Sequence, residues 1–582
     1  MGEVMEFDYI IVGGGSAGSV LASRLSARSA NRVLVCEAGE DTPPDNVPEA
    51  ILDSYPGTAY LNPRFHWTAL KVSTEVVSHN RDPSAPAPRL RKYEQARVLG
   101  GGSSINGQMA NRGAPSDYDE WQSRGASGWG WNDVLPYFKK LERDLDFDDE
   151  WHGQDGPIPI RRVPQSQWCG HAHAVAEAFG RAGYKYLEDQ NGYFEDGYFP
   201  VTISNAAEQR VSAAIGYLTS EVRRRPNLTL STSTHVTELL FDERRCVGVK
   251  ALVDGQQQEF RANEVILSSG AIHSPAHLLR AGIGPAGDLK DMGIPVRHAL
   301  FGVGQRLMDH PSVALASFLN PDARLTNEET RRHLHVAMRY SSGLGDAPPG
   351  DMFVVCASKS SWHAVGEQIA SFLLFVNKTY SETGQVRLQS TNWADEPEVQ
   401  FNLLSDRRDL ERIADGIRRL AALYQDPAMR AVTTDSFPAS YSEKVRQVGE
   451  INTKNRILTS MMATLLDGPT FLRKYLLKNL VMEGHTMDGV CNDEEEAEAF
   501  IRKAAVGVWH ASCTCRMGPA DDPMAVTDSA GRVHGIGGLR VVDASIFPVV
   551  PCANTNIPTI MTAEKIADAM LAESVSSSDV QI

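Results

Sequence analysis

A glycine-rich turn near the N-terminus holds the residues whose chemistry is easiest to interpret. Gly13, Gly15 and Gly18 have the spacing GxGxxG and lie between an apolar, β-branched run and a helix-like segment. Glu37 ends the next apolar run, about 20 residues further on, where dinucleotide-binding folds place an acid. Such glycines let a pyrophosphate approach the backbone, and a carboxylate suits the hydroxyls of a ribose but repels a 2′-phosphate. The pattern predicts a site for FAD or NAD and not for NADP.

Three further segments carry polar side chains whose local pattern alone leaves two interpretations open. Residues 97–106 are rich in glycine and serine and end in Asn106, which could bind the edge of a flat ring, although a surface loop is more typical. His510 follows Trp509 in an apolar setting, which more often indicates a buried core histidine than a base. Residues 554–559 favour a turn that caps a helix.

Composition limits the class of protein. The chain has 582 residues, 42% of them hydrophobic, and a formal net charge of −16, which is unfavourable for binding nucleic acid or an anionic membrane surface. No signal peptide is expected, and no run approaches the roughly 18 apolar residues of a membrane span. Eight scattered cysteines predict a reducing, cytoplasmic location. Cys513 and Cys515 lack a second pair at metal-ligand spacing, so buried thiols and no metal site are expected.

The elements predicted around the glycine turn indicate a nucleotide-binding domain that is assembled from distant segments of the chain. The predicted elements of this domain are strands at 7–12, 32–36, 228–231, 236–240, 247–252, 257–260, 264–268 and 538–543, with helices at 16–28 and 559–571. Residues 310–500 mix strand-like runs such as 371–376 with a helix over 406–424, which predicts a substrate domain. The apolar stretch 457–482 favours packed or lid-like helices over a membrane-surface patch.

Several motifs in this order resemble the glucose-methanol-choline (GMC) family of FAD-dependent oxidoreductases, and within it bacterial aryl-alcohol oxidases of the 5-hydroxymethylfurfural oxidase kind. The motifs are the glycine turn with Glu37 and residues 97–106, 270–275, 303–310, 509–518 and 541–556. The resemblance implies a mixed α/β fold with a Rossmann-like FAD-binding domain and a substrate domain that has an antiparallel sheet and helices. The expected boundaries are 1–160, 220–310 and 500–573 for the FAD-binding domain, 161–219 and 311–499 for the substrate domain, and 574–582 for a disordered tail.

The resemblance also implies roles for single residues. His510 matches the catalytic histidine of the family and Asn556 its partner, while Trp509 and Gly107 are expected in the substrate pocket. Ile105 stands where some members attach the flavin through a histidine, so non-covalent FAD is expected. The expected FAD-binding residues are Gly13, Gly15, Ser16, Ala17, Gly18, Glu37, Ala38, Arg97, Leu99, Gly102, Ser103, Asn106, Gly107, Val236, Trp509, Asp543, Ala544, Asn556 and Pro558.

The implied reaction is oxidation of a primary alcohol, aromatic or furanic, to its aldehyde. His510 accepts the hydroxyl proton, Asn556 orients the alcohol, and a hydride passes to flavin N5. O2 is the expected electron acceptor, giving H2O2. A dehydrogenase that uses a quinone or another carrier stays open as the alternative, and a hydroxynitrile lyase is a more remote one. The expected partners are therefore a small-molecule alcohol and an electron acceptor, without nucleic acid or a transmembrane segment.

Overall fold

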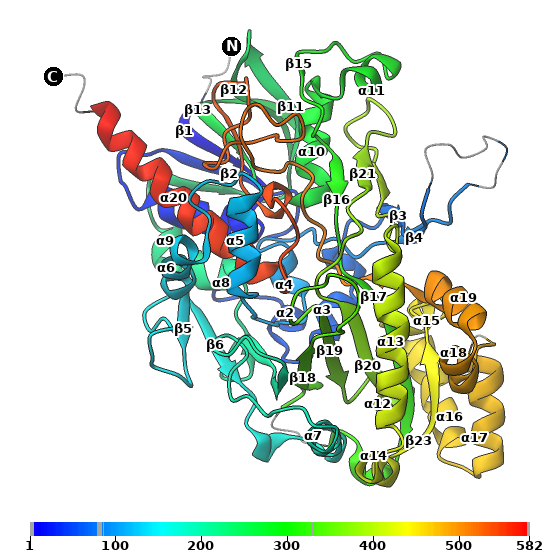
Figure 1. Ribbon diagram of the computed structural model, residues 1–582. Helices are drawn as coiled ribbons and strands as arrows, with labels where there is room; N and C mark the ends of the chain where they lie inside the picture. The colour runs from blue at the N-terminus through cyan, green and yellow to red at the C-terminus, as the bar shows by residue number, and fades with distance from the viewer. Residues whose placement is uncertain (1–4, 78–83, 85–86, 327–329, 483, 579–582) are drawn as a thin grey trace.

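The computed structural model describes residues 5–77, 84, 87–326, 330–482 and 484–578. Two large sheets lie one above the other in Figure 1, and helices pack on their outer faces. The mixed α/β fold that the sequence predicts is therefore confirmed. The predicted disordered tail is helical at its start, because α20 (Asn556–Ser578) extends into it; residues 579–582 lie outside the described part of the chain.

The upper sheet of Figure 1 holds the glycine turn. Its strand order is β10-β2-β1-β13-β12-β11, with β25 beside β13. The parallel part has the strands β1 (Met5–Val12), β2 (Val33–Cys36), β10 (Leu228–Ser231), β13 (Gln256–Leu267) and β25 (Leu539–Val541). The strands β11 (Thr234–Asp242) and β12 (Arg245–Val253) add an antiparallel meander. The parallel strands are buried on both faces, so they carry unbroken apolar runs, as Ile10, Ile11 and Val12 do.

The single strand β13 replaces two predicted strands, 257–260 and 264–268. Its first half pairs with β12 in the antiparallel meander, and its second half pairs with β1 in the parallel part. Residues 261–263, which separate the two predicted strands, continue the strand: Arg261 pairs with both β12 and β1, and Ala262 pairs with β1. β13 therefore joins the two parts of the sheet.

Two helices from opposite ends of the chain cover one face of this sheet. α1 (Ser16–Ser26) begins directly after the glycine turn and packs against α20. Their contact faces are apolar and fully buried, as Val20 and Leu21 of α1 and Ile560 of α20 show. The N-termini of both helices thus lie close to the glycine turn.

The lower sheet of Figure 1 is antiparallel. Its order is β23-β17-β20-β19-β18-β7, with β24 beside β17. The strands are β7 (Gly197–Pro200), β17 (Pro311–Leu319), β18 (Leu334–Tyr340), β19 (Met352–Ala357), β20 (Ile369–Val376), β23 (Thr433–Ala439) and β24 (Val506–Gly507). α13 (Arg407–Leu423) packs on the face that carries Leu315 and Leu374. α16 (Thr453–Leu466) and the π-helical turn after α17 (Thr470–Leu476) pack on the face of Phe318, because successive side chains of a strand point to opposite faces.

The remaining elements connect these layers. The other strands are β3 (Lys71–Ser73), β4 (Arg91–Lys92), β5 (Glu142–Asp144), β6 (Ile158–Arg162), β8 (Thr202–Ala206), β9 (Gln209–Arg210), β14 (Ile283–Gly284), β15 (His298–Ala299), β16 (Gln305–Leu307), β21 (Gly384–Arg387) and β22 (Glu398–Gln400). The other α-helices are α2 (Glu49–Leu52), α3 (Gly57–Tyr60), α4 (Gly102–Ile105), α5 (Pro115–Ser123), α6 (Trp131–Leu141), α7 (Gly170–Arg181), α8 (Ala213–Tyr217), α9 (Ser220–Arg223), α10 (Gly270–Arg280), α11 (Ala286–Asp291), α12 (Ala364–Glu367), α14 (Pro427–Val432), α15 (Glu443–Gly449), α18 (Met487–Asn492) and α19 (Glu494–Ala504). Within the described residues, every helix is too short or too polar to traverse a bilayer.

Candidate active site

A cavity of about 590 Å³ extends from the glycine turn to the residues that follow β24. Most residues that the sequence predicts for the cofactor or the substrate line this cavity. They are Gly13, Gly15, Ser16, Ala17, Glu37, Ala38, Arg97, Gly102, Asn106, Gly107, Val236, Trp509, His510, Asp543, Ala544 and Asn556. The structure therefore brings together segments from both ends of the chain.

The glycine turn forms a cradle in which side chains have no room. A Cβ at Gly13 would lie 2.6 Å from the carbonyl oxygen of Ser268, and Gly13 has φ +100, a conformation that favours glycine. A Cβ at Gly101 would lie 2.7 Å from Cα of Gly15, so the second glycine-rich loop packs directly on the first. Two bare backbone segments that meet at the N-terminus of α1 suit the close approach of a diphosphate.

Glu37 stands at the end of β2 beside this cradle. Its carboxylate accepts hydrogen bonds from the backbone N–H of Gly14 at 2.8 Å and of Gly39 at 2.7 Å. Burial raises the pKa of Glu37, whereas these two hydrogen bonds lower it. The carboxyl group is held where a ribose next to the diphosphate would meet it.

Four predicted FAD-binding residues lie behind the wall of the cavity. A Cβ at Gly18 would lie 2.0 Å from the carbonyl oxygen of Gly13, so this glycine permits the packing of helix on strand. The Ser103 hydroxyl donates to the carbonyl of Gly100 and accepts from the N–H of Ala213, which fixes the second loop. Leu99 and Pro558 are absent from the lining, and Leu99 is fully buried in the upper core.

Two buried arginines that the sequence patterns do not reveal hold the loop around Asn106. Arg210 donates to the backbone carbonyl of Asn106 at 2.7 Å and to its side-chain oxygen at 2.8 Å. Arg332 donates to the carbonyl of Gly107 at 2.7 Å. Burial lowers the pKa of both arginines to about 9. No local sequence signal links these residues to a loop more than 100 positions away.

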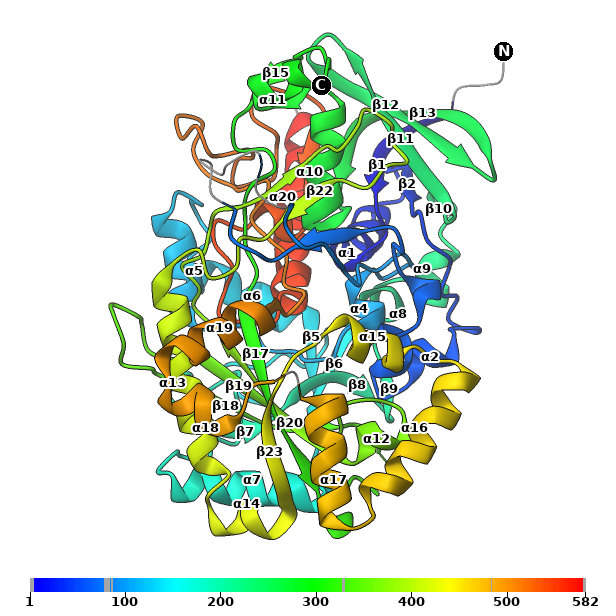
Figure 2. The same cartoon turned by 90° about the vertical axis from the view of Figure 1, so that its right-hand side faces the viewer.

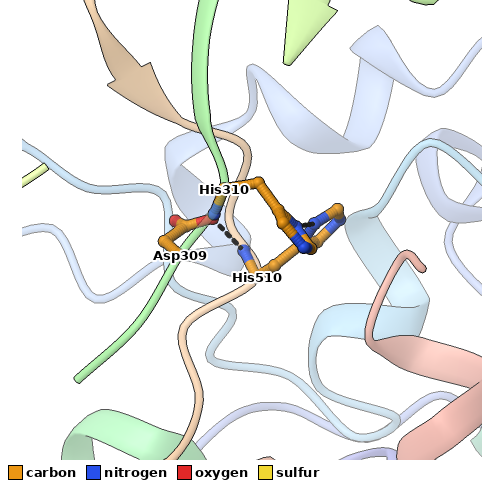
Figure 3. A group of neighbouring side chains, drawn as sticks. All are labelled: Asp309, His310 and His510. Carbon is orange, nitrogen blue, oxygen red and sulfur yellow. Dashed lines mark hydrogen bonds between the residues drawn. The ribbon is translucent and has the colours of Figure 1, made fainter. Parts of the chain in front are cut away.

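Asp309 anchors the histidine that the sequence predicts as the base (Figure 3). One carboxylate oxygen, Oδ1, accepts hydrogen bonds from the backbone N–H groups of His310 at 2.8 Å, of Val508 at 3.1 Å and of His510 at 3.1 Å. Burial raises the pKa of Asp309 to about 7 against these three hydrogen bonds. Asp309 thus holds together two segments that are distant in the sequence.

The contacts of His310 decide which nitrogen of His510 carries a proton. His310 Nε2 lies 3.1 Å from the carbonyl oxygen of Pro551, which can only accept, so Nε2 is the protonated nitrogen. Burial lowers the pKa of His310 to about 4, so its ring is neutral and its Nδ1 is an acceptor. Nδ1 of His510 lies 2.8 Å from this acceptor and must therefore donate (Figure 3). The free lone pair of His510 is consequently on Nε2.

Asn554 is the side chain that meets this lone pair. Its Nδ2 lies 2.9 Å from Nε2 of His510, and its backbone N–H is held by the side-chain oxygen of Asn111 at 2.9 Å. Burial lowers the pKa of His510 well below its ordinary value, and the neighbouring His310 lowers it further, so the ring is neutral at pH 7. The cavity therefore ends at a neutral base beside an amide donor.

Asn556, which the sequence predicts as the partner of His510, points elsewhere. Its side-chain oxygen accepts a hydrogen bond from the Ser16 hydroxyl at 2.8 Å. The correction has a local cause: Asn556 is the first residue of α20 and faces the start of α1, whereas Asn554 lies in the extended turn before the helix. Both residues line the cavity; the Asn554 side chain contacts His510, and the Asn556 side chain contacts Ser16.

Trp509 belongs to an aromatic wall near His510. Its indole N–H donates to Glu94 at 3.2 Å, and the rings of Tyr60 and Tyr441 meet it edge-on with centroids 5.1 and 5.9 Å away. Arg446 of α15 donates to the other oxygen of Glu94 at 2.9 Å. Gly107 also lines the cavity and leaves space there, because an added Cβ at this position would have only Leu334 near it, at 4.0 Å.

The residues present fit a flavin dinucleotide. The cradle would hold the diphosphate and Glu37 would meet a ribose, and the cavity continues from there to His510. Ile105 is buried in a small apolar cluster with Ile51 and Phe65, so no nucleophile stands at the position of covalent attachment. A dinucleotide cradle that leads to a buried neutral base defines a redox enzyme that works on a small molecule next to its cofactor.

Comparisons with known proteins give the family. The GMC oxidoreductase models match residues 7–312 and 379–563, and the chain belongs to this family of FAD-binding oxidoreductases. A 5-(hydroxymethyl)furfural oxidase of Methylovorus sp. (strain MP688) is 44% identical over 97% of this chain and 99% of the relative. An oxygen-dependent choline dehydrogenase of Ectopseudomonas mendocina (strain ymp) is 34% identical over 97% of this chain and 94% of the relative. The crystal structure of pyridoxine 4-oxidase from Mesorbium loti has a TM-score of 0.78 at 26% identity, over 97% of this chain and 99% of that one. The resemblance to the family that the motifs indicate is confirmed.

Proposed function

We propose that the protein oxidises the primary alcohol of an aromatic or furanic substrate to an aldehyde, with non-covalent FAD and with O2 as the electron acceptor. The observation that carries the proposal is the lone pair of His510 Nε2, which is fixed by the chain of contacts from Pro551 through His310. The relative with 44% identity, a 5-(hydroxymethyl)furfural oxidase, supports this substrate class.

His510 and Asn554 suit a hydroxyl group placed between them. The hydroxyl would donate to Nε2 of His510 and accept from Nδ2 of Asn554, the two groups that now face each other at 2.9 Å. FAD, when bound, supplies the acceptor for the hydride that leaves the alcohol carbon. As His510 takes the hydroxyl proton, Asn554 stabilises the negative charge that develops on oxygen. Burial of His510, at 6% exposed, keeps bulk water from competing for the base.

Non-covalent binding of FAD rests on Ile105, and the aromatic class of substrate rests on Trp509 with its neighbours Tyr60 and Tyr441. Flat rings stack favourably against such walls. The cytoplasmic location that the scattered cysteines indicate stays a prediction.

An oxygen electrode with FAD-loaded protein tests the proposal on benzylic, furanic and aliphatic alcohols. Oxygen uptake with formation of H2O2 and preference for the ring-bearing alcohols is the expected result. Turnover that needs a dye or a quinone would replace the oxidase by a dehydrogenase. If no alcohol bleaches the flavin in the absence of oxygen, the oxidation is ruled out and the lyase is the remaining alternative. His510→Ala should lower turnover about 10²- to 10⁴-fold and retain bound FAD.

A further inference from the structure

The outer face of two helices beside the lower sheet is apolar and exposed. This α16–α17 face consists of Ile457, Leu458, Met461, Leu465, Phe471 and Tyr475, which are 58%, 52%, 64%, 47%, 77% and 66% exposed. Figure 2 shows α16 and α17 together at the margin of the molecule. Scattered apolar side chains are ordinary on a surface, but this many on two adjacent helices mark an interaction surface.

The fold does not need these side chains for its own core. α16 packs through Leu466, and the turn after α17 through Leu477, against Phe318 and Phe437 of the lower sheet. The exposed residues recur on the opposite side of each helix at intervals of three and four, as in Phe471 and Tyr475. Both helices therefore carry a second apolar face, which points away from the protein.

Basic side chains surround this face. Lys454 and Arg456 lie on exposed positions of α16, and Lys474 and Lys478 lie on exposed positions of α17 and the turn after it. Between residues 453 and 478 the sequence has one acid, Asp467, which pairs with Arg324. The face is thus locally positive in a chain whose formal net charge is −16.

We propose that the α16–α17 face docks the protein on the surface of an anionic lipid bilayer. Apolar and aromatic side chains next to lysines are the composition of helices that lie in the membrane interface, where rings enter the headgroup region and lysines meet lipid phosphate. The overall negative charge predicts no such binding, but lipid attraction depends on charges within about 10 Å of the membrane, and those are positive here. The face crosses no bilayer; it lies on one leaflet.

The docking face is joined to the cavity by a short run of chain. Tyr441, which contacts the ring of Trp509, and Arg446, which binds Glu94, precede α16 directly. The docking face and two residues that support the aromatic wall therefore belong to one continuous segment, residues 441–478.

Vesicle flotation with the full-length, FAD-loaded protein tests this inference. The probes are vesicles of phosphatidylcholine alone and of phosphatidylcholine with phosphatidylglycerol. At low salt the protein should float with the phosphatidylglycerol vesicles at least about tenfold more than with phosphatidylcholine vesicles, and 0.5 M salt should release much of it.

Matched variants assign the effect to the face. Phe471→Ser and the double variant Lys474→Glu/Lys478→Glu should each reduce flotation about tenfold or more. Phe301→Ser, at an apolar side chain that is 58% exposed elsewhere, and Lys290→Glu of α11 should leave it unchanged. Flavin absorbance and melting temperature verify that each variant is folded.

Three outcomes would overturn the inference: no flotation with either vesicle, equal flotation with both, or equal losses in the control variants. Sedimentation of the FAD-loaded protein without vesicles tests the competing explanation, a dimer formed through this face. A concentration-dependent dimer that Phe471→Ser dissociates would show that a second copy of the chain covers this face. Each of these readouts is independent of alcohol turnover, so the docking inference and the proposed function can fail separately.

Discussion

Replacement of His310 by leucine removes the group that decides which nitrogen of His510 carries its proton. One buried polar group then loses its partner: Nδ1–H of His510, which now lies 2.8 Å from Nδ1 of His310. The carbonyl of Pro551 loses its contact with His310 at 3.1 Å but keeps the backbone N–H of Ala553 at 2.7 Å. An unpaired buried group costs about 1–3 kcal/mol, and the cost on Nδ1–H falls on the tautomer that leaves Nε2 free. If this penalty raises the free energy of the reactive tautomer by the full amount, kcat/KM falls about 5- to 150-fold.

A glutamine at position 310 provides the matched control. Its side-chain oxygen can accept from His510 while its amide donates to Pro551, so His310→Gln preserves the order of donors and acceptors. Steady-state oxidation of the best alcohol should therefore show a large loss for His310→Leu and a substantial recovery for His310→Gln. Bound FAD should be equal in both variants, because His310 is fully buried and does not line the cavity.

The pH profile separates this role from a general loss of structure. His310 is neutral in the assayed range, and its Nδ1 accepts from Nδ1–H of His510, a contact that favours protonated His510. Leucine removes this acceptor and keeps the site apolar, so the pKa of His510 should stay below its ordinary value, and His310→Leu should lose kcat/KM equally across the pH range. A leucine variant with full kcat/KM, or one whose loss is confined to low pH, would refute the tautomer argument.

Three further predictions follow from the site. Asn554→Ala should lower kcat about 10²- to 10³-fold, as loss of a donor to a developing oxyanion does. Asn556→Ala should leave kcat within about tenfold of the parent value and weaken FAD retention. Kinetics of the FAD-loaded variants test both, and the reverse order would restore Asn556 as the partner of His510. In the parent protein protonation of His510 should not lower kcat/KM as the pH falls from 8 to 6.5, because burial holds the pKa of His510 below that range and the base stays neutral. Asp309, whose pKa is about 7, is the group to which a limb in that range would belong; a limb that persists in Asp309→Asn would contradict the burial argument. Gly101→Val should abolish FAD binding, because a side chain there meets Gly15 at 2.7 Å, and flavin absorbance of the purified, folded variant measures it; a yellow protein would show that the two loops part at little cost.

The glycine turn and the strands around it could be predicted from sequence because their signals are local. Glycine spacing, the apolar runs on either side and the acid at position 37 follow from rules that act within about 30 residues. The helix predicted over 406–424 corresponds to α13 (Arg407–Leu423) for the same reason: its apolar period is strong and its N-cap, Asp406, is explicit.

The choice between Asn554 and Asn556 could not be made from the sequence. Two asparagines that are two residues apart have the same chemistry, and the residue at which α20 begins decides which one faces His510. The role of His310 is equally hidden, because it depends on a contact between residues 200 positions apart. Pairing of β17, which begins directly after His310, with β24, which ends shortly before His510, creates that contact.

The apolar stretch 457–482 shows a third limit. Periodicity correctly indicates helices with one packed face, as Leu466 demonstrates. It cannot tell whether a second apolar face is covered, because that depends on which elements the rest of the chain sends past it.

The contacts of His310 and His510 with residues 551–554 make the orientation of the base depend on assembly of the whole protein. His310 and His510 flank the paired strands β17 and β24 of the lower sheet, whereas Pro551 and Asn554 come shortly after Val549 and Val550 of the upper core. The base therefore acquires its orientation only when both cores have closed on each other, and a chain with one half folded has no aligned acceptor for a proton. Moderate heating that loosens the contact between the two cores should therefore abolish activity while the helix content is unchanged. Heat inactivation would then measure the separation of the two cores and not the unfolding of either one.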